Sequence, residues 1–193
     1  MRVTGGTISR REIRVPRDIR PTQDKVRAAI FNSLGSFVVG VRVLDLFAGS
    51  GAFGIEAWSR GAAFVCWVES DRRVLPALKE NVSALCRDGA PAQIRQADAL
   101  RFLEKDVSGE PFNLILADPP YDRDGSRRWL EKMLPLLEGH SILAADGVLV
   151  FEQDASEPVL QRDSWLLLRD GRYGGTRVLI YRRTAGGTGE QNT

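Results

Sequence analysis

Short apolar runs alternate with helix-like segments from Val41 almost to the end of the chain. Most of these runs are continuously apolar, which is typical of strands covered by helices on both faces of a parallel sheet. The segments between them carry apolar residues at helical spacing. The predicted strands are Val41–Phe47, Ala63–Glu69, Gln93–Gln96, Phe112–Ala117 and Gly147–Glu152, and the predicted helices are Ala52–Arg60, Asp71–Cys86, Ala99–Glu104 and Ser126–Leu137. This order predicts a doubly wound α/β sheet.

The last part of the chain departs from this alternation. Trp165–Leu168 and Arg177–Tyr181 are strand-like, and a short connection with Asp170-Gly171 and Gly174-Gly175 separates them. A short connection favours an antiparallel pair. We therefore expect a mostly parallel, Rossmann-like sheet of seven strands that ends in an antiparallel hairpin. By analogy between folds, such a sheet is more typical of class I methyltransferases than of dinucleotide dehydrogenases.

The start of the chain is basic. The first 27 residues carry seven Arg and one Lys against three acids, whereas the net charge of the whole chain is only +2. A basic arm on a mildly acidic body favours a polyanionic partner such as nucleic acid. Gly5-Gly6 predicts a turn, and Arg20-Pro21-Thr22 is expected to end the arm and to start a helix that reaches about Phe37. We expect a basic arm and helix over residues 1–38, an α/β domain over residues 39–183 and a disordered tail over residues 184–193.

Composition excludes several other classes of protein. No apolar run approaches the roughly 18 residues that span a membrane, so we expect a cytoplasmic protein without membrane contact. We also expect a monomer. Cys66 and Cys86 lack a Cys-x-x-Cys or His cluster, which predicts reduced thiols and no zinc site. The single histidine, His140, is expected at the surface.

A glycine-rich turn follows the first predicted strand of the sheet. Asp45-Leu46-Phe47 runs into Gly49-Ser50-Gly51, and Gly54 follows in the next helix. Glycine allows a sharp turn and lets a ligand approach the backbone. Glu69 ends the next predicted strand, where an acid can accept hydrogen bonds from ribose hydroxyls. This pattern fits both a nicotinamide dinucleotide and S-adenosylmethionine.

Two further acids favour S-adenosylmethionine. Asp45 at the strand end would repel a pyrophosphate and attract an ammonium or sulfonium group. Asp98 follows the third predicted strand and is placed to accept a hydrogen bond from an adenine amino group.

The tetrapeptide Asp118-Pro119-Pro120-Tyr121 follows an apolar strand, at the sheet edge where open α/β sheets bind ligands. The exocyclic amine of a base is a poor nucleophile, because its lone pair is delocalised into the ring. Hydrogen bonds from its N–H groups to Asp118 and to the carbonyl of Pro119 would make the nitrogen more tetrahedral. The base could stack on Tyr121, which is worth roughly 1–3 kcal/mol. In-line displacement at a sulfonium methyl would then need no metal and no covalent enzyme intermediate.

Other functions fit parts of this pattern. One is amino-methylation of DNA adenine, of another RNA base or of a protein glutamine, although many such enzymes carry Asn where this chain has Asp118. A second is a nicotinamide-dependent oxidoreductase, which would bind NADH in place of S-adenosylmethionine. A third is a catalytically inactive RNA-binding or assembly factor, whose role would survive the loss of Asp118.

Taken together, the motifs resemble the RsmD family of bacterial small-subunit ribosomal RNA guanine-N2 methyltransferases, from about Arg2 to Tyr181. The segments that carry the resemblance are Gly5-Gly6, Arg20-Pro21-Thr22, Val26-Arg27, Phe31-Asn32, Asp45-Leu46-Phe47-Ala48-Gly49-Ser50-Gly51, Ser59-Arg60-Gly61-Ala62, Val68-Glu69 and Asp118-Pro119-Pro120-Tyr121. In one place the chain departs from the family: Ser9-Arg10-Arg11-Glu12 stands where an Arg-Gly-Arg-Lys-like stretch is usual.

The resemblance implies a role for each part of the site. Asp118, Pro119, Pro120 and Tyr121 would hold a flipped guanine within the small subunit. The expected cofactor-binding residues are Asp45, Phe47, Gly49, Ser50, Gly51, Glu69, Ser70, Asp98, Ala99 and Asp118. The expected RNA-binding residues are Arg10, Arg11, Arg14, Arg17, Arg20, Thr22, Lys25 and Arg27.

Overall fold

The computed structural model describes residues 1–15, 24–86, 92–105, 109–121 and 127–184. Its sheet has seven strands in the order β3-β2-β1-β4-β5-β7-β6. Every neighbouring pair from β3 to β5 is parallel, and β7 is antiparallel to both β5 and β6. The strands are β1 (Arg42–Leu46), β2 (Phe64–Glu69), β3 (Ala92–Gln96), β4 (Phe112–Ala117), β5 (Leu143–Asp154), β6 (Trp165–Tyr173) and β7 (Thr176–Arg183). This arrangement confirms the predicted doubly wound sheet with a terminal antiparallel hairpin.

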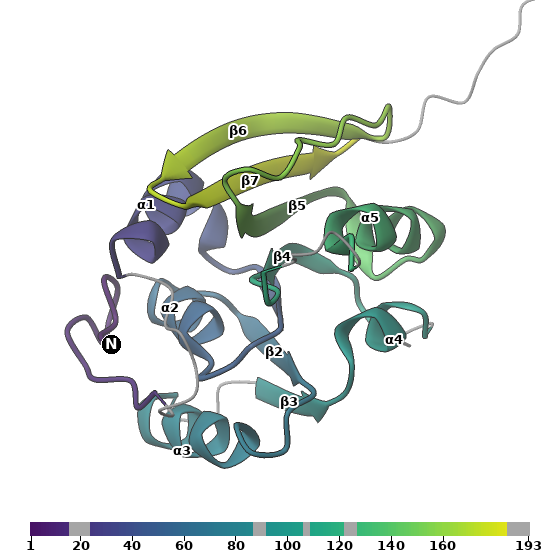
Figure 1. Ribbon diagram of the computed structural model, residues 1–193. Coiled ribbons are helices and arrows are strands. Elements are labelled where there is room, and N and C mark those ends of the chain that lie inside the picture. The colour runs from purple at the N-terminus through teal and green to yellow at the C-terminus, as the bar shows by residue number, and fades with distance from the viewer. Residues whose placement is uncertain (16–23, 87–91, 106–108, 122–126, 185–193) are drawn as a thin grey trace, which may run out of the picture.

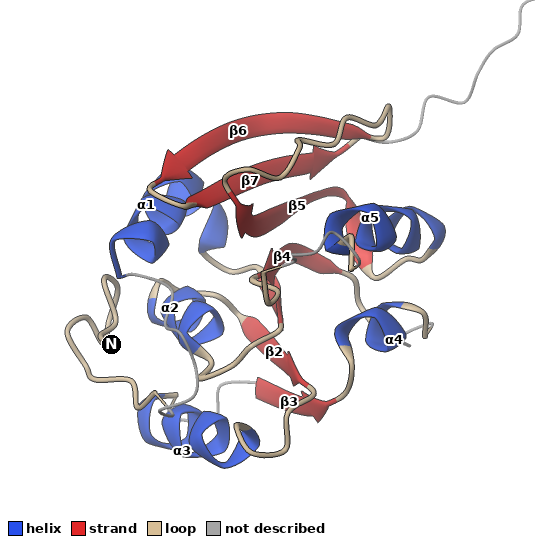
Figure 2. Cartoon of the chain, in the orientation of Figure 1, coloured by secondary structure: helices blue, strands red, loops and turns tan. Residues whose placement is uncertain are grey.

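Helices cover both faces of the sheet and form two apolar cores (Figures 1 and 2). The helices are α1 (Asp24–Leu34), followed by a 3-10 turn (Gly35–Val38), α2 (Ala52–Ser59), α3 (Leu75–Leu85), α4 (Ala99–Leu103) and α5 (Trp129–Gly139). One core joins α1, α2 and α3 to the sheet, with Trp67 at its centre. The other joins α4 and α5 to the opposite face, with Leu46 and Phe151 among its members. Among the described helices, none has the length and apolarity to cross a membrane.

The strand order reverses direction at β1, which lies between β2 and β4. The chain winds from β1 through β2 to β3 on one side and from β4 onward on the other. In such sheets a crevice opens at the carboxyl ends of the strands next to the reversal. The glycine turn follows β1 and the Asp118 tetrapeptide follows β4, so the fold brings both motifs to this crevice.

The terminal hairpin differs in detail from the prediction. Asp170 and Gly171 belong to β6, and the turn consists of Gly174 and Gly175 alone. Gly174 has a φ of +62°, which suits glycine in a two-residue hairpin loop. Asp170 and Arg177 lie on the paired strands β6 and β7. The Arg177 guanidinium binds the Asp170 carboxylate across the hairpin, with an Nη2–Oδ2 distance of 2.6 Å. Residues 185–193 of the expected tail lie outside the described part.

The N-terminal arm folds back on itself and packs on the body. An isolated antiparallel bridge joins Arg2 to Glu12, and Val3 and Ile13 are buried in the same core as α1 and α2. Gly6 has a φ of +81°, and a Cβ there would lie 1.9 Å from the Ser59 carbonyl oxygen, so the predicted turn requires glycine. Arg10 has a left-handed φ of +70°, a conformation that non-glycine residues seldom adopt.

The prediction that Arg27 contacts RNA is wrong. Its side chain is fully buried, and it donates to the carboxylates of Asp24 (2.9 Å) and Glu56 (3.4 Å) and to the carbonyl of Arg2. Glu56 also accepts hydrogen bonds from the backbone N–H and hydroxyl of Thr4. Arg27 therefore ties the arm to α1 and α2, because a buried guanidinium requires such partners.

Candidate active site

Four acidic side chains gather at the carboxyl edge of the sheet. Leu46, Val68, Ala117 and Phe151 form one row across β1, β2, β4 and β5. The residues that directly follow Val68, Ala117 and Phe151 in the chain are Glu69, Asp118 and Glu152. Because successive side chains alternate between faces, these acids share the face that Asp45 occupies one layer deeper. The register, rather than any local motif, makes them neighbours.

The pKa of Asp45 depends on its burial and on two neighbouring acids. Burial raises the pKa of Asp45 well above its ordinary value of 3.8, while the Gly54 amide that donates to it (2.8 Å) lowers this pKa. The negative charges of Asp118 and then Glu69 raise the pKa of Asp45 further. A cation bound at this edge would relieve the mutual repulsion of the three carboxylates.

The glycine turn holds Glu69 in place. One carboxylate oxygen of Glu69 accepts the Gly49 N–H at 2.8 Å, and the other accepts the Asp71 N–H at 2.7 Å. Phe47, Gly49 and Gly51 have positive φ angles of 58°, 54° and 83°, so the chain turns sharply after β1. The turn therefore sets the orientation of the acid at the end of β2.

Packing, rather than ligand approach, explains the glycines at positions 51 and 54. A Cβ at Gly51 would lie 2.5 Å from Leu78 of α3, and one at Gly54 would lie 2.2 Å from the Trp67 indole. Both missing side chains point into the protein. Glycine at these two positions lets α2 and α3 pack close to the sheet.

The other residues predicted to bind the cofactor are Ser50, Ser70, Asp98 and Ala99, of which two are buried and two are exposed. Ser50 is buried and its carbonyl accepts a hydrogen bond from Asn81, while Ser70 is exposed just after β2. Asp98 is exposed and caps α4, because its carboxylate accepts the Arg101 N–H at 3.0 Å, and Ala99 is buried. Since β3 lies beside β2, Asp98 is at the same edge of the sheet, on the side away from β4.

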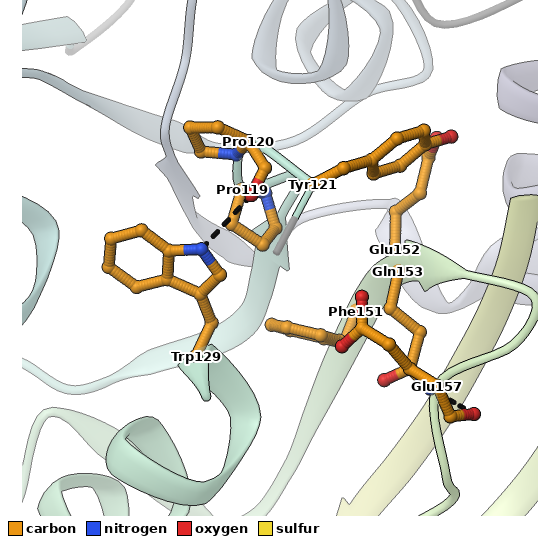
Figure 3. Close-up of a pocket in the computed structure, with 8 residues that line it drawn as sticks. All are labelled: Pro119, Pro120, Tyr121, Trp129, Phe151, Glu152, Gln153 and Glu157. Carbon is orange, nitrogen blue, oxygen red and sulfur yellow. Dashed lines mark hydrogen bonds between the residues drawn. The ribbon is translucent and has the colours of Figure 1, made fainter. Parts of the chain in front are cut away.

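Hydrogen bonds at Pro120 and Tyr121 hold the tetrapeptide after β4; Figure 3 shows the one from Trp129 to Pro120. The indole N–H of Trp129 donates to the Pro120 carbonyl at 3.0 Å, and the Tyr121 hydroxyl lies 2.7 Å from the Thr176 hydroxyl. Phe47 packs edge-on against Trp129, with ring centroids 5.0 Å apart. The tetrapeptide is thus held by the start of α5, by the start of β7 and, through Trp129, by the turn after β1.

A shallow hollow, open to solvent, lies beside the tetrapeptide. Its lining residues are Pro119, Pro120, Tyr121, Trp129, Phe151, Glu152, Gln153 and Glu157 (Figure 3). Sequence reasoning missed the last five of these. Glu152 had a usable signal, because it ends the predicted strand that parallel pairing places beside Asp118. Trp129 and Glu157 carry no such signal in the sequence.

The arm exposes several of the predicted RNA-binding residues. Arg10, Arg11 and Lys25 are exposed, and Arg14 is exposed while it binds Glu80 with an Nη1–Oε2 distance of 2.7 Å. Predictions for Arg17, Arg20 and Thr22 concern residues outside the described ranges.

Comparison with known proteins places this geometry in a family. Residues 1–182 match the family model described as "Conserved hypothetical protein 95". The "Ribosomal RNA small subunit methyltransferase D" of Escherichia coli (strain K12) is 35% identical over 191 residues, which covers 97% of this chain and 92% of that protein. The chain belongs to the RsmD family. The resemblance seen in the sequence motifs is thereby confirmed.

Further relatives of this RsmD-family chain agree over its full length. The YlbH protein of Bacillus subtilis (strain 168) is 36% identical over 187 residues, covering 95% of this chain and 99% of that protein. The solved structure of yhhF from Escherichia coli superposes with a TM-score of 0.84 and 35% identity, covering 96% of this chain and 98% of that chain. The fold of yhhF therefore matches that of this chain over nearly its whole length.

Proposed function

We propose that this chain transfers a methyl group from S-adenosylmethionine to the exocyclic N2 amine of a guanine in small-subunit ribosomal RNA. One observation carries the proposal: Asp118, in an Asp-Pro-Pro-Tyr corner, and Glu69 each lie close enough to Asp45 to raise the pKa of Asp45. A group that can grip an amine thus adjoins acids suited to a cationic nucleoside. The name of the Escherichia coli relative supports the substrate class.

The residues at this edge suit S-adenosylmethionine. Asp45 is 2% exposed and faces like charges, so an ammonium or sulfonium group would stabilise its ionised form. Glu69 is fixed by two backbone amides and each of its oxygens keeps a lone pair for a ribose hydroxyl. When bound, S-adenosylmethionine supplies an electrophilic methyl group on its sulfonium sulfur.

The tetrapeptide would activate and orient the amine. Asp118 and the Pro119 carbonyl accept hydrogen bonds from the two N–H groups, which directs the nitrogen lone pair toward the methyl carbon. The new N–C bond forms as the S–C bond breaks, leaving S-adenosylhomocysteine. The methylated nitrogen then loses one proton to Asp118 or to water. Positioning and charge placement do most of this work.

The hollow would receive a base that has left its stack. Tyr121 offers a flat face for stacking, and its hydroxyl contact with Thr176 limits how far the ring can turn. Extruding a base costs a few kcal/mol. Contacts from the exposed Arg10 and Arg11 to phosphates flanking the base would offset that cost.

The decisive assay follows transfer of labelled methyl from S-adenosylmethionine to small ribosomal subunits, naked ribosomal RNA, DNA and protein. We expect label in small-subunit RNA, in a nucleoside that co-migrates with N2-methylguanosine. Label in adenine, DNA or protein only would overturn the substrate, and tight NADH binding without binding of S-adenosylmethionine would overturn the chemistry.

Asp118→Ala tests the role of the tetrapeptide. We expect kcat to fall by about 10²–10³-fold, because the amine loses its charged acceptor. The Kd for S-adenosylhomocysteine, measured by calorimetry, should change much less than kcat. Asp163→Ala, which removes an exposed acid from the loop before β6, is the control and should keep wild-type kcat. Equal kcat in both variants would exclude Asp118 from the reaction.

A further inference from the structure

We propose that Glu152 selects guanine, by accepting a hydrogen bond from the N1–H of the target base while Asp118 holds the adjacent N2 amine. This inference rests on the proposed function and adds a residue that reads the identity of the base. It concerns a side chain on β5, outside the glycine turn and the tetrapeptide.

The register of the sheet places Glu152 beside Asp118. Ala117, the last residue of β4, pairs with Phe151 of β5; Asp118 directly follows β4, and Glu152 is the next residue on β5. Neighbouring strands lie about 4.8 Å apart, and paired positions project to the same face. Two carboxylates at this spacing can meet two adjacent donors on the edge of one planar base.

Glu152 also lies in the wall of the hollow that adjoins the tetrapeptide. It is 4% exposed, and it lines this hollow together with Pro119, Pro120 and Tyr121. The side chains of Glu152 and Gln153 leave β5 in opposite directions (Figure 3). Gln153 uses its amide N–H groups on the carbonyls of Glu157 and Pro158, and Glu157 accepts the Asp154 N–H, so both support the turn after β5.

The chemistry of the purine edge makes a carboxylate selective at this position. Guanine presents donors at both N1 and N2, and a carboxylate is an acceptor only. Adenine and 2-aminopurine present a lone pair at N1, which a buried carboxylate would repel. A site built around a hydrogen bond rejects an analogue that lacks it, because the buried polar group is then left unpaired.

The test compares guanine with 2-aminopurine, which keeps the 2-amino group but has no hydrogen on N1. Small-subunit RNA is joined from fragments so that the base mapped by the methylation assay is one or the other, and it is used both naked and reconstituted into subunits. Wild type is expected to methylate guanine at least about 100-fold better in kcat/KM. Glu152→Gln offers an amide that can donate to N1, so this preference should fall below about 10-fold.

Asp163→Asn is the control, because it removes one negative charge from an exposed acid outside the hollow and should retain the wild-type preference. Comparing variants with wild type on the same two bases cancels the effect of the oxygen that 2-aminopurine lacks. A wild-type preference below about 3-fold would overturn the inference without any variant. An unchanged preference in a folded Glu152→Gln protein would do the same. If wild type methylates neither RNA, the proposed function fails instead.

Discussion

Asp45 is the residue whose ionisation depends most on what is bound at the sheet edge. Burial raises its pKa above 3.8, and Asp118 and Glu69 raise it further. The folded protein without ligand therefore keeps a proton on Asp45 at pH values where an exposed aspartate has lost it. The contribution of Asp45 to the free energy of unfolding decreases as pH rises through this interval.

The affinity for a ligand that carries an ammonium group should increase over the same pH interval in which this contribution to stability decreases. Because the cation favours ionised Asp45, binding of S-adenosylhomocysteine should lower the pKa of Asp45 and release a proton. Its Kd should fall as pH rises above 3.8 and level off once Asp45 is ionised in the free protein. Calorimetric titrations at several pH values, in buffers of different ionisation enthalpy, measure both effects. In Asp45→Asn binding should be weaker, and this pH dependence should be absent; a wild-type pH profile in that variant would contradict the assignment.

Sequence reasoning at the level of single residues succeeded where an acid ends a strand. Asp45, Glu69 and Asp118 could be predicted to lie together, because parallel strands end at a common edge. Arg27 could not be placed correctly, because its burial depends on Glu56, a partner 29 residues away. From the sequence alone, an arginine in a basic segment is predicted to be exposed, because its buried partner is not known.

At the scale of elements, α5 supports the tetrapeptide through its first residue. The Trp129 N–H donates to the Pro120 carbonyl at 3.0 Å, and its ring contacts Phe47 from the turn after β1. Packing of α5 on the sheet, through Leu130, Met133 and Leu134, fixes this donor in space. Trp129 is thus a positioning residue for the Asp118 corner.

Trp129→Phe removes the donor and keeps most of the ring. We expect kcat to fall about 10-fold, as one lost hydrogen bond of roughly 1.4 kcal/mol would give, while the Kd for S-adenosylhomocysteine stays near wild type. Trp165→Phe is the matched control, since it removes an indole N–H of β6 that donates at 2.8 Å to Glu138, at the opposite end of α5 from Trp129. That variant should lower Tm but keep kcat. A similar kcat in both variants would show that the Trp129 hydrogen bond does not orient the tetrapeptide.

Most elements could be predicted from periodicity, and the misses have local causes. β4 has the predicted ends, whereas β5 runs from Leu143 to Asp154 and is longer than its apolar part. Its first residue, Leu143, is buried, but Ala144, Ala145 and Asp146 after it are partly or fully exposed small or polar residues that interrupt the apolar pattern. The hollow was missed because its walls come from β5, α5 and the turn at Glu157, which only the folded chain brings to the tetrapeptide.

At the scale of the whole molecule, the basic arm and the catalytic edge form parts of one body. Val3 and Ile13 share a core with α1 and α2, and the Arg27–Glu56 pair joins the arm to both helices. A fixed arm holds Arg10 and Arg11 at a set position relative to the hollow. Phosphates bound by the arm would then determine which nucleotide can reach Asp118.

This arrangement predicts a specific salt dependence of RNA binding. Each phosphate contact on single-stranded RNA contributes about 0.7 to the slope of log K against log salt, so Arg10→Ala with Arg11→Ala should make the slope shallower by about 1.4. The control removes two exposed arginines, Arg169 and Arg182, from the terminal hairpin, and should leave the slope unchanged. Affinities at several salt concentrations, measured with small-subunit RNA, decide between them. Equal slopes in both double variants would mean that charge anywhere on the surface contributes alike, and that the arm does not determine where the RNA lies.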